Sequence, residues 1–199
     1  MNPGGWQIGE GMTGQQNTDK AELILGAALD LFEQQGFDGT AVPELARKAG
    51  VGTGTIYRYF DTKEALLNAL YQRWKSAYND VVLAPFAPGL TIRERFGQYW
   101  RRMSGFARGE PRAVRFMEMH HHAAYLDAAS REMSQRYLQV ATAFIDEGVR
   151  AGVLKPLQPQ LAAALLWGAL IGLMKMFPAL DDAMVAQVEA CLWDAVRRH

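Results

Sequence analysis

Hydrogen-bonding and basic side chains gather in one short segment of the sequence. Hydroxyl groups and one guanidinium follow one another closely there: Thr53, Thr55, Tyr57, Arg58 and Tyr59. Hydroxyls can donate to phosphate oxygens, and an arginine can fork onto the O6 and N7 acceptors of guanine. Gly52 and Gly54 carry no side chain, so the backbone can approach a ligand closely, and Lys63 is expected to add a cation at a helix start. The segment predicts contacts to the phosphates and base edges of double-stranded DNA.

The same spacing also fits a simpler interpretation. Tyr57, Tyr59 and Phe60 could be aromatic residues of a hydrophobic core. Ile56 and Phe60 stand four positions apart, so they share one helix face, which we expect to point inward. Tyr57 and Arg58 then point outward, as DNA contacts require.

Helical periodicity continues on both sides of this segment. An apolar stripe with the spacing of one helix face precedes it: Ile24, Ala27, Ala28, Leu31 and Phe32. Thr18 or Asp19 can cap the start of that helix, and Gly36 can end it in the left-handed conformation. Two short helices are predicted at 42–49 and 53–60, and a glycine-containing turn joins them. This is the geometry of a helix-turn-helix, whose second helix enters the major groove of DNA.

The remainder of the chain is predicted to be a larger helical bundle. Asp61, with Glu64 three positions later, is expected to cap a longer helix, and Pro85, Pro88 and Gly89 mark a domain boundary. Further helices are expected at 92–107, 111–122, 130–151, 158–176 and 183–197. We therefore predict an all-α protein with three parts: a flexible arm (1–17), a three-helix helix-turn-helix domain ending in a long linking helix (18–84), and a helical effector-binding and dimerisation domain (85–199).

Composition limits the classes of function. Lys and Arg number 21, as do Asp and Glu, so the formal net charge is zero, and one cysteine excludes an internal disulfide framework. Residues 40–63 nevertheless hold four basic and two acidic side chains, which predicts weak non-specific DNA binding through few ionic contacts. The longest uncharged apolar stretch, residues 161–174, is shorter than the roughly 20 residues of a membrane span. We expect a soluble, cytoplasmic protein that contacts no membrane.

Residues 18–70 resemble the DNA-binding domain of the TetR family of bacterial transcriptional regulators. The resemblance rests on "LFEQQGFDGT", "ELARKAGV", "GTIYRYF" and "KEALL", a highly specific combination that covers about the first third of the chain. It implies phosphate contacts for Thr40, Tyr57 and Lys63, and a DNA-reading position for Arg58. The chain departs from the family at Ala41, Pro43 and Gly52-Thr53, where side-chain caps and a basic group are lost. These departures imply an operator of its own.

The resemblance also implies a homodimer on a roughly palindromic operator, and an effector site among the middle helices. The last two helices would pack against a second subunit through Leu165, Ala169, Val188, Leu192 and Val196. The effector site would be lined mainly by aromatic and methionine side chains: Trp100, Met103, Phe106, Phe116, His120, Tyr137, Phe144 and Trp167. Such a pocket favours an apolar effector, although each of these residues is also a plain core candidate. No cofactor is expected.

Two alternatives have less support in the sequence. An enzyme could use the histidines at 120–122 with Glu118 or Cys191, but no nucleophile elbow, phosphate loop or metal-ligand spacing accompanies them. Consecutive helix positions point about 100° apart, so three histidines in a row cannot bind one metal ion from a regular helix. We expect Cys191 to be a small buried hydrophobe. The other alternative is a regulator without an effector, whose bundle serves dimerisation only.

Overall fold

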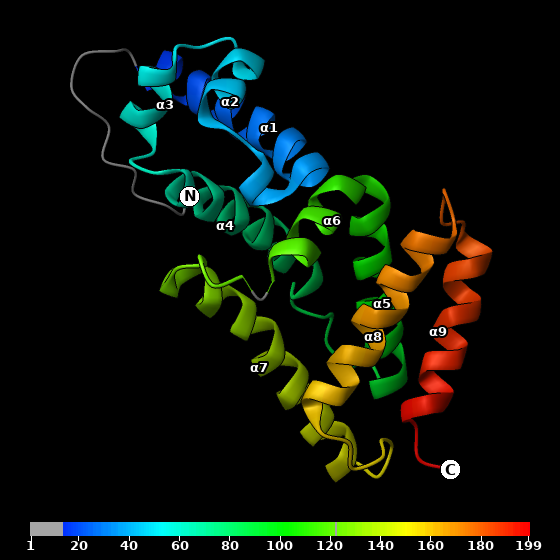
Figure 1. The fold of residues 1–199 in the computed structure, drawn as a ribbon. Helices are drawn as coiled ribbons and strands as arrows, with labels where there is room; N and C mark the ends of the chain where they lie inside the picture. Colours follow the sequence, from blue (N-terminus) through cyan, green and yellow to red (C-terminus); the bar gives the residue numbers. More distant parts are fainter. Residues whose placement is uncertain (1–13, 122) are drawn as a thin grey trace. The chain divides into compact units, whose positions relative to one another are not determined.

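The computed structural model describes residues 14–121 and 123–199, which form nine helices and no strand (Figure 1). Their bounds are α1 (Gly14–Gly39), α2 (Val42–Ala49), α3 (Thr53–Tyr59), α4 (Lys63–Val82), α5 (Ile92–Gly109), α6 (Pro111–His120), α7 (Ala128–Arg150), α8 (Pro159–Met176) and α9 (Asp182–Val196). The all-α prediction is confirmed. Residues 1–13 of the predicted arm, and His122, lie outside the described residues.

The chain divides into two compact units within α4, one up to Leu70 and one from Tyr71 on. We call them the N-terminal unit and the C-terminal unit. The predicted boundary after residue 84 falls in the loop after α4, later than this division. The difference arises because Tyr71 already packs in the C-terminal unit, where its ring lies 6.4 Å from that of Phe116 and its hydroxyl lies 2.9 Å from the Ser134 hydroxyl.

The predicted apolar stripe of α1 forms the core of the N-terminal unit, with Ile24, Ala28 and Phe32 fully buried. The start of α1 was placed too late, because residues 14–17 are helical and Thr18 and Asp19 lie inside the helix. Gly36 has the positive φ that the prediction requires, 72°, but its ψ of 178° is extended and not left-handed helical, and it interrupts α1 instead of ending it.

The cap of α4 also differs from the prediction. The Thr62 hydroxyl, not Asp61, accepts the backbone N–H of Ala65 at 3.0 Å. Thr62 lies one position nearer the first turn, so its short side chain reaches the unpaired N–H groups there.

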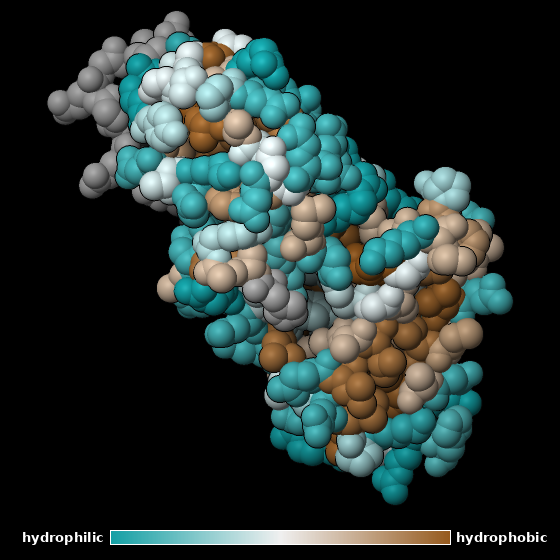
Figure 2. All heavy atoms as spheres, in the orientation of Figure 1, coloured by the Kyte–Doolittle hydropathy of each residue, from teal (hydrophilic) through white to brown (hydrophobic). Residues whose placement is uncertain are grey.

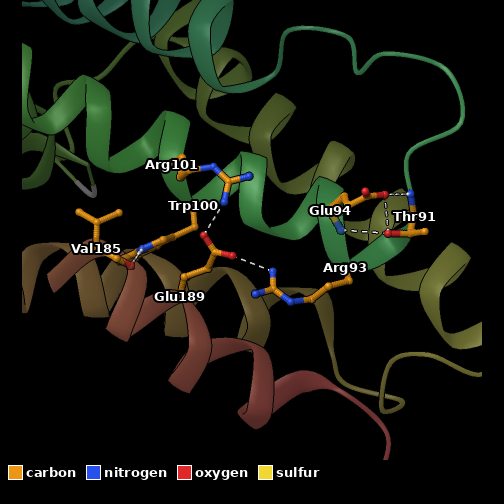
Figure 3. A network of polar contacts seen from close by, with 7 residues as sticks. All are labelled: Thr91, Arg93, Glu94, Trp100, Arg101, Val185 and Glu189. Carbon is orange, nitrogen blue, oxygen red and sulfur yellow. Dashed lines mark hydrogen bonds and ion pairs between the residues drawn. The ribbon is translucent and has the colours of Figure 1, made fainter. Parts of the chain in front are cut away.

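In the C-terminal unit, α5 packs against both α8 and α9, and α7 packs against α8 (Figure 1). A buried polar network ties α5 to α9 (Figure 3). The Trp100 indole donates to the backbone oxygen of Val185 at 2.7 Å, and Arg93 and Arg101 donate to the two carboxylate oxygens of Glu189 at 2.7 and 2.8 Å. Both arginines remain partly solvated, so the Glu189 charge is compensated without burying two more ions.

Candidate DNA-binding, effector and dimerisation sites

The exposed face of α3 carries the predicted DNA contacts. Ile56 and Phe60 are buried, whereas Tyr57 is 48% exposed and Arg58 is also exposed, so the predicted division of the helix into two faces is confirmed. The Arg58 guanidinium lies 5.3 Å from the centre of the Tyr59 ring, a cation–π contact between neighbouring residues. Thr53 and Thr55 are half-buried on the same short helix, and the neighbouring Gly52 and Gly54 are exposed.

The turn before α3 depends on glycine. Gly50 follows α2 with φ of 67°, and its N–H bonds to the backbone oxygens of Ala46 and Arg47. A residue with a β-carbon is strained in this conformation, so Gly50 allows the chain to reverse between the two short helices. Gly52 then precedes α3 without a side-chain cap, and its backbone oxygen accepts the N–H of Thr55 at 2.8 Å.

Thr40 and Lys63, for which the family resemblance implies phosphate contacts, both make hydrogen bonds within the N-terminal unit. Thr40 is 1% exposed and its hydroxyl donates to the Gly36 oxygen at 2.8 Å, so it neither faces DNA nor caps α2. The Lys63 ammonium donates to the backbone oxygens of Phe37 at 2.8 Å and Thr40 at 3.0 Å. It also lies 4.2 Å from the centre of the Phe37 ring. An ammonium has three donors, and these two bonds leave one for an external anion.

An apolar cavity of about 40 Å³ lies in the C-terminal unit, between α5, α7 and α8. Tyr137 and Phe144 are the two predicted effector residues that line it. Its other lining residues are Leu83, Phe96, Tyr99, Val140, Ala141, Ile145, Ala162, Ala163, Leu166 and Val196. The volume is small beside the 300–1,000 Å³ typical of drug-sized ligand sites.

The other predicted effector residues lie outside this cavity. Trp100, Met103 and Phe116 are fully buried core side chains, and the Trp100 indole is already bonded to Val185. Phe106 and Trp167 instead pack edge-on against Tyr78, at 5.3 and 5.9 Å. Aromatic residues at helical spacing cannot distinguish a cavity wall from filled core, so an effector-binding role for these residues stays a prediction.

His120 is buried, and its Nδ1 lies 2.6 Å from the Tyr125 hydroxyl. Burial lowers its pKa to about 4, so the ring is neutral near pH 7. Glu118 accepts the Trp167 indole N–H and does not pair with a histidine in the described part of the chain. Three or more metal-ligating side chains do not come together among the described residues.

Sequence reasoning missed a polar cluster on α4. The side chains of Lys75, Tyr78 and Asn79 are all at least 93% buried in the C-terminal unit. With Trp74 they occupy positions i, i+1, i+4 and i+5, which lie on one helix face. This spacing was the signal available in the sequence, because it places Lys75 and Asn79 on the same helix face as the aromatic residues Trp74 and Tyr78.

Helices α8 and α9, which were predicted to form the dimer interface, both expose apolar side chains. Some of the five predicted interface residues are instead buried in the single chain. Leu165 of α8 is 38% exposed and Ala169 is half-buried. Leu192 and Val196 of α9 are instead buried in the chain's own core, and Val188 is half-buried. Cys191, expected to be a small buried hydrophobe, is exposed in the single chain.

The exposed stripe of α8 runs through Leu161, Leu165, Gly168, Gly172 and Met176, at intervals of three or four residues. Figure 2 shows the apolar patch that α8 forms with the adjoining α9. The 18 residues of α8 have a mean hydropathy of 1.3 and only 17% of them are buried. By length and composition α8 alone among the described helices could cross a membrane, and it is also the kind of helix that a partner subunit covers.

A short outward-facing helix after a glycine turn, followed by a separate helical unit, defines a helix-turn-helix DNA-binding regulator. The sequence profile "Bacterial regulatory proteins, tetR family" matches residues 24–70, and "Tetracyclin repressor-like, C-terminal domain" matches residues 71–198. The chain belongs to the TetR family of bacterial transcriptional regulators.

Three similar proteins illustrate this relationship. The HTH-type transcriptional regulator RutR of Escherichia coli strain K12 is 33% identical over 159 residues, which cover 75% of this chain and 71% of RutR. The regulator YhgD of Bacillus subtilis is 25% identical and covers 84% of this chain and 91% of its own. A TetR-family regulator from Marinobacter aquaeolei VT8 shares the fold, with a TM-score of 0.80, 22% identity, and coverage of 94% of this chain and all of that one.

Proposed function

We propose that the chain is a homodimeric, cytoplasmic repressor, and that a small, mainly apolar effector releases it from its operator. The observation that carries the effector response is the cavity beside Tyr137 and Phe144. Its walls are almost wholly apolar, and helices α5, α7 and α8 meet there. A ligand that enters must move at least one of these helices, because the cavity of about 40 Å³ is too small for a metabolite.

The proposed dimer rests on the exposed stripe of α8. Gly168 and Gly172 lie in the middle of that stripe, where missing side chains allow a second helix to approach closely, and Leu161 and Leu165 extend the apolar surface. A second copy related by a two-fold axis covers the stripe with its own equivalent. The same symmetry presents two α3 helices to half-sites about 34–36 Å apart, or a multiple of that spacing.

In this dimer, effector and operator favour different separations of the two α3 helices. Each then weakens the binding of the other by the same factor, because coupling between two sites is reciprocal. The test measures the affinity of the effector with and without operator DNA, and that of operator with and without effector. The proposal is supported if operator DNA weakens effector binding, and the effector weakens operator binding, by the same factor. An effector that binds equally well with and without DNA refutes it.

The small cavity also favours a second candidate, a dimeric regulator without a small-molecule input. In that case the C-terminal unit serves only to pair two DNA-binding units. A screen of apolar and weakly polar metabolites by thermal melting separates the two candidates. A compound that raises the melting temperature and lowers operator affinity supports the first, and a screen without such a compound supports the second.

A further inference from the structure

Lys75 of α4 is a largely buried cation whose contact in the described part of the C-terminal unit is with the face of the Tyr78 ring. Its side chain is only 7% exposed, and neither a hydrogen bond nor an ion pair joins it to another described residue. Burial lowers its pKa to about 8, so the ammonium still carries its charge near pH 7. An uncompensated buried charge is costly, and proteins normally pair such a group with an opposite charge.

Three neighbouring side chains on the same helix face carry buried polar atoms without a hydrogen-bond partner among the described residues: Trp74, Tyr78 and Asn79. These atoms are the Trp74 indole N–H, the Tyr78 hydroxyl and the Asn79 Oδ1. Most buried polar atoms in native proteins have a partner, so adjacent exceptions are informative. The ammonium, the hydroxyl and the indole N–H can all donate, whereas the Asn79 Oδ1 accepts. Donors outnumber acceptors on this face, so a group that satisfies it must chiefly accept hydrogen bonds.

Aromatic rings form the surroundings of this face. The Lys75 ammonium lies 5.3 Å from the centre of the Tyr78 ring. The rings of Phe106 and Trp167 stand edge-on to Tyr78, and the Tyr137 ring lies 6.3 Å from it. Tyr137 also lines the apolar cavity, so it connects that cavity with the polar face of α4.

The carboxylate of Glu118 does not supply the missing charge. It accepts the indole N–H of Trp167 and makes no ion pair with Lys75. Asn79 donates to the backbone oxygen of Met133 at 3.2 Å, and as a neutral amide it cannot neutralise an ammonium. The charge complement must come from outside the described residues.

We propose that the effector is an organic carboxylate whose anionic group pairs with Lys75 and whose apolar body lies along Tyr78 and Tyr137 toward the cavity. This inference rests on the proposed effector response and names the chemical class of the effector. A neutral ligand of equal size satisfies the apolar walls but leaves the ammonium unpaired. Binding therefore selects a carboxylate over the alcohol of the same carbon skeleton.

The test uses the full-length protein and a panel of straight-chain carboxylates from butanoate to dodecanoate, together with benzoate. Each is paired with the corresponding alcohol, and binding is measured by calorimetry and thermal melting. We expect at least one carboxylate to bind about tenfold more tightly than its alcohol, the size of effect expected for one charge-assisted hydrogen bond. A panel without this preference overturns the proposal.

The variants Lys75→Met and Lys75→Gln remove the charge and should lose about tenfold in carboxylate affinity, with less than about a twofold change for the alcohol. Arg136→Met removes one exposed cation from α7 and serves as the matched control, which should bind like wild type. Two neutral variants are used so that a folding defect in one leaves the other informative. Retention of the carboxylate preference in both neutral variants refutes the role of Lys75.

Operator binding separates this inference from the proposed function. A carboxylate that binds through Lys75 and weakens operator binding supports both. A carboxylate that binds through Lys75 without changing operator affinity supports the anion site and refutes its role in release. An alcohol that weakens operator binding as strongly as its carboxylate supports effector release and refutes the anion site.

Discussion

The ammonium of Lys63, at the first position of α4, donates to the backbone oxygen of Phe37 at 2.8 Å. It also donates to the oxygen of Thr40 at 3.0 Å, just before α2 begins. A single side chain therefore joins the start of α4 to the end of α1 and to the chain that enters the helix-turn-helix. A residue implied to contact phosphate also holds the DNA-binding unit together.

Lys63→Met should lower the free energy of unfolding by about 1–3 kcal/mol, because it removes hydrogen bonds from a charged donor to two carbonyls. Urea unfolding measures the loss. Lys48→Met is the matched control, since Lys48 forms a 2.9 Å ion pair with Asp30 at the surface and should cost no more than about 1 kcal/mol. Equal stability losses in the two variants would show that the hydrogen bonds of Lys63 stabilise the fold no more than a surface ion pair does.

Leu165→Glu tests the dimer. The variant places a carboxylate in the middle of the exposed apolar stripe of α8, where a partner subunit would have to bury it. We expect a monomer by analytical ultracentrifugation and loss of tight operator binding. Gln135→Glu is the matched control, because it adds the same charge at an exposed position of α7, and this variant should remain a dimer. A Leu165→Glu protein that stays dimeric at micromolar concentration would place the interface elsewhere.

Gly97→Ala tests the packing of α5 against α9. A β-carbon on Gly97 would lie 2.6 Å from Glu189 Oε1. Arg93 donates to that oxygen and Arg101 to Oε2, so the two arginines hold the carboxylate in place (Figure 3). Overpacking of this kind typically costs about 1–3 kcal/mol, which we expect as a loss in thermal and chemical stability. Gly105→Ala, on the same helix, has open space for its β-carbon and should gain about 0.5–1 kcal/mol. A stabilised Gly97→Ala would mean that Glu189 moves aside easily.

Lys75 makes stability depend on pH. Burial lowers its pKa from 10.5 to about 8, so between these values the unfolded chain binds a proton that the folded chain does not. The free energy of unfolding therefore rises with pH across that interval, and below pH 8 the full penalty of about 3 kcal/mol persists. Burial raises the pKa of Tyr78 and Tyr137, so both stay neutral in this interval.

The measurement compares wild type with Lys75→Met at pH 7 and at pH 10. We expect Lys75→Met to be the more stable protein at pH 7 and the difference to shrink toward pH 10. A difference that does not change with pH would show that Lys75 titrates normally in the folded state.

The N-terminal unit was the part most accessible from the sequence. The glycine turn and the spacing of Ile56 and Phe60 determine both the short helices and the outward direction of Tyr57 and Arg58, since these depend on local backbone chemistry. The partners of Lys63 were not predictable, because Phe37 lies 26 positions away and a flexible ammonium leaves no periodic pattern.

The C-terminal unit shows the opposite case. Helix α8 is apolar nearly all round, so its periodicity cannot tell which stripe meets the chain's own core. In α9 the larger apolar residues Leu192 and Val196 turn inward, and Cys191 and the small residues beside it turn outward. The face that α9 turns inward is determined by its contacts with α5, from Arg93 to Glu189 and from Trp100 to Val185. These contacts join residues more than 80 positions apart, so the sequence pattern does not reveal them.

The central claim, sequence-specific DNA binding through the exposed face of α3, is tested most directly by selecting bound DNA from a random pool with wild-type protein and with Arg58→Ala. We predict that wild type enriches a palindrome whose half-site centres lie about 34–36 Å apart or a multiple of that distance. Arg58→Ala should bind it about 1–3 kcal/mol more weakly and lose preference at one position in each half-site. An unenriched pool with wild type, or an identical preference in Arg58→Ala, would contradict the account.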